Sequence, residues 1–119
     1  MLAEAEQAKA NTYPEPGGYA CAVLTSKGKV YQGAAYLSDT QTLTMHGEAT
    51  ALTHAAIRGD TDIVAITGPN CHICKQLIWE HSLQTGIEIQ IVISQGDGVK
   101  LVPISELMPY PWPEATSKE

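Results

Sequence analysis

Four side chains of this 119-residue chain have the types and the spacing of a catalytic metal site. His46 stands two residues before Glu48, and Cys71 and Cys74 form a C-x-x-C sequence later in the chain. An imidazole and two thiolates hold zinc well, and three protein ligands leave its fourth position open for water. A carboxylate that is not needed as a ligand can then move protons beside that position. The pattern predicts a catalytic zinc site, with Glu48 as general acid and base.

A C-x-x-C sequence also occurs in structural zinc sites and in redox-active dithiols. A structural site needs a fourth ligand, for which Cys21 and His54 are candidates. Cys21 lies among apolar residues in a predicted strand, which favours a place in the core. His54 and His81 fall on predicted helices at the edge of the core, and His72 is expected to point to solvent.

The composition predicts one domain spanning residues 1–119, with residues 1–12 and 113–119 as peripheral ends. Hydrophobic residues make up 44% of the chain, and 13 acidic against 7 basic residues give a net charge of −6. An acidic chain without a Lys/Arg cluster is a poor candidate for binding nucleic acid. Without an apolar run of about 18 residues, no membrane span is expected. The odd number of cysteines favours reduced thiols and a cytoplasmic location.

The elements that must position the four side chains follow from the apolar patterns. Apolar runs bounded by turn residues predict strands at 19–24, 30–37, 62–67, 87–94 and 99–104. Helices are predicted over 1–12, 47–58 and 72–83, with a short one at 106–108. This order predicts an α/β fold, a three-layer α-β-α sandwich with one mixed five-stranded sheet. Gly33, inside the second strand, indicates a close approach of backbone or ligand.

Both halves of the metal motif lie at predicted helix starts. His46 precedes one helix and Cys71 begins another. Helix N-termini carry free N–H groups and the positive end of the dipole, which favours thiolate. If the two helices start at the same sheet edge, His46, Cys71 and Cys74 meet where open α/β sheets bind ligands.

At these motifs the chain resembles the cytidine deaminase superfamily, in particular the small cytidine and blasticidin-S deaminases. The stretches that carry the resemblance are CAVLTSKGKVYQG, HGEATAL, NCHICKQL and ISELMP, within residues 13–112. The resemblance implies a cytidine deaminase-like fold and a tetrahedral zinc on His46, Cys71 and Cys74. It also implies Glu48 as general acid and base, and a homo-oligomer, most often a tetramer.

The chain departs from the family pattern around the predicted site. The Asn and Glu with which cytidine deaminases hold the ribose hydroxyls are replaced by Ala35 and Leu37. Asn70 stands where the family has Pro, and it either contributes an amide to substrate recognition or serves as a turn residue. A site that lacks hydroxyl-binding partners discriminates against ordinary cytidine.

Five residues are therefore predicted to contact substrate: Ala35, Leu37, Gly47, Asn70 and Trp112. Trp112 follows the closing ELMP, where related deaminases place an aromatic side chain over the active site, often that of a neighbouring subunit. A subunit contact or an anchor for the C-terminal tail is the alternative role for Trp112.

The sequence thus predicts a zinc-dependent hydrolytic deaminase of a small amino-substituted heterocycle, a pyrimidine-type base, nucleoside or analogue, which releases ammonia. The alternatives are a non-catalytic zinc-binding protein with the deaminase fold and a cytidine deaminase proper. A deaminase acting on nucleic acid is disfavoured by the acidic charge.

Overall fold

The computed structural model describes residues 1–115, so residues 116–119 of the predicted peripheral end lie outside the described residues. One five-stranded sheet has the strand order β2-β1-β3-β4-β5. Its strands are β1 (Ala20–Thr25), β2 (Val30–Ala34), β3 (Ile63–Thr67), β4 (Gln90–Gln95) and β5 (Gly98–Pro103). β3 and β4 are parallel, whereas β1–β2, β1–β3 and β4–β5 are antiparallel.

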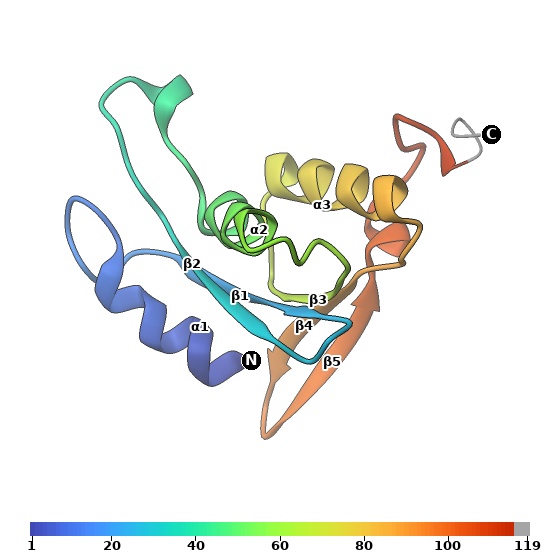
Figure 1. Ribbon diagram of the computed structural model, residues 1–119, viewed down its shortest axis with the longest axis horizontal. Coiled ribbons are helices and arrows are strands. Elements are labelled where there is room, and N and C mark those ends of the chain that lie inside the picture. Colours follow the sequence, from blue (N-terminus) through green and yellow to red (C-terminus); the bar gives the residue numbers. More distant parts are fainter. Residues whose placement is uncertain (116–119) are drawn as a thin grey trace.

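Helices cover both faces of this sheet (Figure 1). α1 (Leu2–Ala8) lies on one face, and α2 (Gly47–Ile57) and α3 (His72–Thr85) lie on the other. The predicted three-layer α-β-α sandwich with a mixed five-stranded sheet is therefore confirmed. β5 lies at an edge of the sheet, which suits Pro103 because proline cannot donate to a ladder. None of the helices in residues 1–115 is long and apolar enough to cross a membrane.

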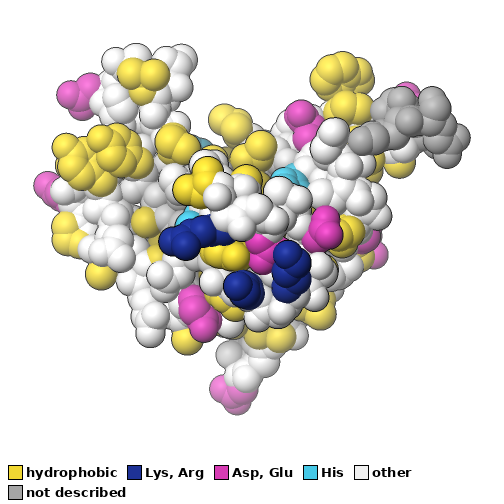
Figure 2. Space-filling view, in the orientation of Figure 1, with side chains coloured by type: hydrophobic (Ala, Val, Ile, Leu, Met, Phe, Trp, Pro, Cys, Tyr) yellow, Lys and Arg dark blue, Asp and Glu magenta, His cyan; other side chains and the backbone are white. Residues whose placement is uncertain are grey.

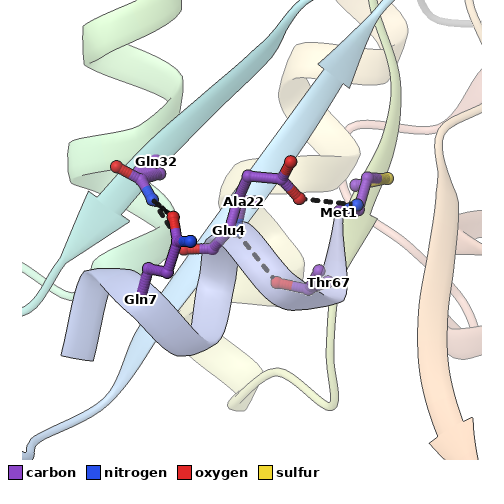
Figure 3. Close-up of polar contacts among 6 residues, drawn as sticks. All are labelled: Met1, Glu4, Gln7, Ala22, Gln32 and Thr67. Carbon is purple, nitrogen blue, oxygen red and sulfur yellow. Dashed lines mark hydrogen bonds and ion pairs between the residues drawn. The ribbon is translucent and has the colours of Figure 1, made fainter.

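α1 is attached to the sheet by polar contacts as well as by its buried alanines, Ala5 and Ala8 (Figure 3). The side-chain amide of Gln32 on β2 donates to the Glu4 carbonyl oxygen at 2.8 Å. Nearby, the amide N–H of Ala22 on β1 donates to the Thr67 hydroxyl of β3 at 3.0 Å. The sequence-predicted peripheral segment 1–12 therefore packs against the strands that lead to the candidate site.

The end of β2 differs from its predicted extent. β2 stops at Ala34 rather than residue 37, because the chain beyond it pairs with the N-terminal loop instead of β1. Tyr13 donates its N–H to the Ala35 carbonyl at 3.0 Å, and Leu37 donates to the Tyr13 carbonyl at 2.8 Å. These bonds hold the loop after α1 beside the segment that runs from β2 to α2 (Figure 1).

Smaller differences occur at other boundaries. β4 begins at Gln90 instead of residue 87, and α3 continues to Thr85, where Gly86 ends it in the left-handed conformation with φ 77°. The short helix predicted at 106–108 is a 3-10 helix over Ile104–Leu107. Gly86 is suited to this place because it lacks the Cβ that penalises left-handed backbone.

α2 lies directly on β2, and Gly33 makes this possible. A Cβ atom on Gly33 would lie 2.2 Å from the Gly47 carbonyl oxygen and 2.3 Å from the Ala51 nitrogen. The predicted close approach of backbone at Gly33 is thus confirmed. Side chains from the sheet, α2, α3, the residue before β4 and the 3-10 helix form the buried core: Cys21, Val23, Ala51, Leu52, Ala55, Ile63, Ile66, Ile78, Trp79, Ile89, Ile91, Val102 and Ile104. Because this core fixes both helices, it also fixes where they begin.

Candidate functional site

The starts of α2 and α3 come together and bring the three predicted metal ligands to one point. His46 is the residue that caps α2, Cys71 caps α3, and Cys74 lies in the first turn of α3. The Nδ1 atom of His46 lies 3.2 Å from the Cys74 sulfur and 3.4 Å from the Cys71 sulfur. The three ligand atoms all lie within 4.8 Å of one another. The three ligand atoms therefore meet beyond the carboxyl end of β3, the central strand of the sheet.

The donor set fits a zinc ion. Bonds of about 2.3 Å from zinc to sulfur and about 2.0 Å to nitrogen are compatible with donors this close to one another. Cys74 is buried, His46 is half-buried and Cys71 is exposed, so the cluster is open on one side. Neither Cys21 nor His54 belongs to the cluster that the described residues form, and Cys21 is wholly buried in the core. The three-ligand set therefore matches the open type of site rather than a closed structural one.

Glu48 lies in the first turn of α2 and is only 2% exposed. Its Oε2 atom accepts a hydrogen bond of 2.7 Å from the side-chain amide of Asn70, which also donates to the Thr67 carbonyl at 3.1 Å. Its Oε1 atom is buried without a hydrogen-bond partner among the described residues. A buried carboxylate oxygen without a partner is costly, so its retention points to a chemical role.

Two ionisable groups at the candidate site have raised pKa values. Burial raises the pKa of the Cys74 thiol above its usual value, and the Glu48 carboxylate nearby adds to the effect. Burial and the same carboxylate also raise the pKa of Tyr19, whose hydroxyl donates to the Pro69 carbonyl at 3.1 Å. For Cys74, burial thus opposes the thiolate that the helix start was expected to favour, and a divalent cation bound between the thiols would offset this, because thiolate is the form that binds metal.

A pocket of about 500 Å³ opens over the cluster. His46, Glu48 and Cys71 line it, whereas the buried Cys74 is not among its lining residues. Four of the five residues predicted to contact substrate also line it: Ala35, Leu37, Gly47 and Asn70. The structure thus brings these residues to one cavity with the metal cluster.

Trp112, the fifth, does not line this pocket. Its side chain is 77% exposed, and its carbonyl oxygen accepts a hydrogen bond of 2.6 Å from the Gln76 side chain. Tyr110 is likewise exposed. Within one chain, the segment after ELMP therefore lies on α3 rather than over the pocket of the same chain.

Another part of the pocket lining comes from the segment after α1, which was not assigned to the site from the sequence. Thr12, Tyr13, Glu15 and Tyr19 line it. The Tyr13 ring stacks on that of Tyr36, with ring centroids 4.5 Å apart. Tyrosines on both sides of a Pro/Gly loop were the available signal, but the pairing with residues 35–37 is long-range. The other histidines lie outside the metal cluster. The ring of His54 contacts the Gln32 carbonyl and that of His81 contacts the Thr61 carbonyl, whereas His72 is exposed.

Comparison with solved structures shows the same fold in cytidine deaminases. The chain is similar to cytidine deaminase from Burkholderia pseudomallei with a TM-score of 0.76 and 23% identity, covering 93% of this chain and 95% of that one. The cytidine deaminase of Mycobacterium leprae gives a TM-score of 0.73 and 22% identity, with 92% and 94% covered. That of Mycobacterium tuberculosis gives 0.72 and 20%, with 94% of each chain covered. No protein-family model and no curated protein matches the sequence. The likeness shows the cytidine deaminase fold and is consistent with the resemblance found in the motifs.

Proposed function

We propose that the protein is a zinc-dependent hydrolytic deaminase of a small, unphosphorylated, amino-substituted heterocycle. The observation that carries this proposal is the meeting of His46, Cys71 and Cys74 with the buried Glu48 at one pocket. His46, Cys71 and Cys74 would hold the ion. Zinc there would acidify a water molecule and so supply a nucleophile at neutral pH.

Glu48 acts as the proton carrier in the proposed reaction. Its carboxylate accepts a proton from the water whose oxygen adds to the amine-bearing ring carbon. Glu48 passes this proton to the neighbouring ring nitrogen. It then takes the second proton from the hydroxyl group that the addition has formed and transfers it to the amine, so that the C–N bond breaks and ammonia leaves. A keto group remains on the ring, and water and substrate account for every atom of the products. Burial keeps this exchange away from bulk solvent.

The pocket lining supports a ring without phosphate as the substrate. Ala35 and Leu37 line the pocket where the family's ribose-binding Asn and Glu are expected, and neither side chain can hydrogen-bond a hydroxyl. No Lys or Arg is among the residues that line the pocket in the described part of the chain, whereas Glu15 and Glu48 are. Phosphate would meet no compensating charge there, so free bases and uncharged analogues are favoured.

A non-catalytic zinc-binding role is the alternative of a different class. It leaves the burial of Glu48 beside the metal cluster without a purpose, since a structural site does not need that carboxylate. Nucleic acid is a less suitable substrate: on the face shown in Figure 2 the Lys and Arg side chains form one small group with acidic side chains around it. A cytidine deaminase proper differs from our proposal only in its preference for the nucleoside.

The test is ammonia release by the zinc-loaded protein from matched sets of base, nucleoside and nucleotide. Aminopyrimidines, aminopurines and aminotriazines supply the rings, and the chelated protein is the control. We expect release from at least one free ring or analogue, and none from the nucleotides. Release that is fastest from cytidine would favour the cytidine deaminase alternative. Full zinc occupancy without release from any ring would favour the non-catalytic one.

We also propose that the protein is cytoplasmic and forms a homo-oligomer, with a tetramer as the expected state. In such an assembly the exposed Trp112 could cover a neighbouring subunit's pocket. Light scattering of the zinc-loaded protein gives the state directly, and a monomeric wild type would remove this role for Trp112.

A further inference from the structure

The amide nitrogen of Asn70 is committed to the protein, whereas its Oδ1 atom is buried without a hydrogen-bond partner among the described residues. Asn70 is 9% exposed, and its Nδ2 atom donates to both Glu48 Oε2 at 2.7 Å and the Thr67 carbonyl at 3.1 Å. The NH₂ group has two hydrogens, so these two bonds use its full donor capacity. The assignment of oxygen and nitrogen is also fixed, because a flipped amide would point its oxygen at two acceptors.

The backbone around Asn70 makes room for this amide. A Cβ atom on Gly68 would lie 2.9 Å from Asn70 Oδ1 and 2.5 Å from a methyl carbon of Ile91. Any other residue at 68 would displace the amide or the core side chain. The turn from β3 to α3 therefore holds the Asn70 side chain against Thr67 and within hydrogen-bond distance of Glu48.

The consequence for Glu48 is that its two oxygens are no longer equivalent. Oε2 is tied to Asn70, whereas Oε1 is buried and has no partner among the described residues. The hydrogen bond to Oε2 restricts rotation of the carboxylate and so favours one orientation of Oε1. Proton transfer depends on such fixed geometry, because the carrier must lie within hydrogen-bond reach of the proton it moves.

We propose that Asn70 is a positioning residue that fixes the Glu48 carboxylate and leaves Oε1 as the oxygen that carries the proton. This inference rests on the proposed deaminase function. It gives Asn70 a role distinct from both the substrate contact and the turn residue that the sequence suggests. It also explains how a side chain can replace the proline expected at this position without loss of a defined site.

Kinetics of Asn70→Asp separate the positioning role from the two others. Asp has the same shape and is equally suited to a turn, but a second carboxyl group at this distance either repels Glu48 when ionised or shares a proton with it, so the neutral donor is lost in both states. We expect kcat to fall about 10- to 100-fold, as for a misplaced catalytic group, with KM and zinc content close to those of the wild type. Ser82→Ala is the matched control, since Ser82 is equally buried and its hydroxyl bonds only the Ile87 carbonyl. That control should keep its kcat.

A second measurement reads the contact without turnover. The chain contains two asparagines, Asn11 and Asn70, so ¹⁵N-asparagine labelling gives two pairs of side-chain amide signals. In Glu48→Ala we expect the Asn70 pair to shift and the pair of the exposed Asn11 to stay, in metal-free and zinc-loaded protein alike.

The outcomes distinguish the two levels of the proposal. An active wild type whose Asn70→Asp variant keeps kcat would overturn the positioning role alone, as would Asn70 signals that do not respond to Glu48→Ala. An increase in KM without a change in kcat would instead indicate a substrate contact. A zinc-loaded wild type that releases no ammonia from any ring would overturn the deaminase function, and with it this role.

Discussion

Gly33→Ala tests how the fold sets the position of the metal cluster. The added Cβ would lie 2.2 Å from the Gly47 carbonyl oxygen and 2.3 Å from the Ala51 nitrogen. Both are backbone atoms, so α2 must move about 1 Å away from β2 to restore ordinary contact. Overpacking of this kind costs about 3 kcal/mol of unfolding free energy, the upper end of the usual range. Because His46 caps the displaced helix, we also expect zinc affinity to fall about 10- to 100-fold, as when groups that orient ligands are lost.

The assay is denaturant unfolding of the metal-free variant, followed by competition titration of zinc. Gly98→Ala is the matched control: it is the same change within a strand, but a Cβ there meets nothing within 4 Å. That control should keep both stability and zinc affinity. If Gly33→Ala unfolded at the wild-type denaturant concentration and bound zinc equally well, the close packing of α2 on β2 would not position the site as argued.

Three further predictions concern the site. Cys71→Ala should bind less than one zinc per chain under conditions that saturate the wild type, whereas Cys21→Ala, which changes a core side chain, should keep full zinc content by metal analysis. After chelation the exposed Cys71 should be alkylated readily at pH 8, while Cys21 should stay unmodified in the folded protein because burial raises the pKa of its thiol and excludes the reagent; mass spectrometry of the labelled chain reads both. Ala35→Asn combined with Leu37→Glu should lower KM for cytidine about tenfold relative to KM for the free base. If the ratio of these two KM values did not change, residues 35 and 37 would not select against ribose.

The parts of the site that were predictable are encoded locally. His46 and Cys71 each directly precede a helix, and the helix starts are visible in the sequence. The C-x-x-C spacing then places Cys74 one turn inside α3. The meeting of the three ligands also requires that both helices lie on one face of the sheet, and this condition is met only in the folded chain.

The parts that were not predictable depend on contacts between distant segments. β2 ends early because Ala35 and Leu37 pair with Tyr13, more than twenty residues before them in the chain. That pairing holds Tyr13 beside the site, together with the loop after α1 that contributes to the pocket lining. The bond from Asn70 to Glu48 joins two helix starts in the same way. Residue type made Asn70 a candidate, but only the fold shows which atom its amide reaches.

Glu48→Gln separates proton transfer from metal binding, because it keeps the size of a buried side chain and removes its capacity to carry a proton. Ammonia release and zinc content are measured for the wild type and the variant, on the ring that the wild type deaminates fastest. We expect one zinc per chain in both proteins and a fall in kcat of about 10²- to 10⁴-fold in the variant. A variant that binds zinc fully and releases ammonia at the wild-type rate would contradict the proposed role of Glu48.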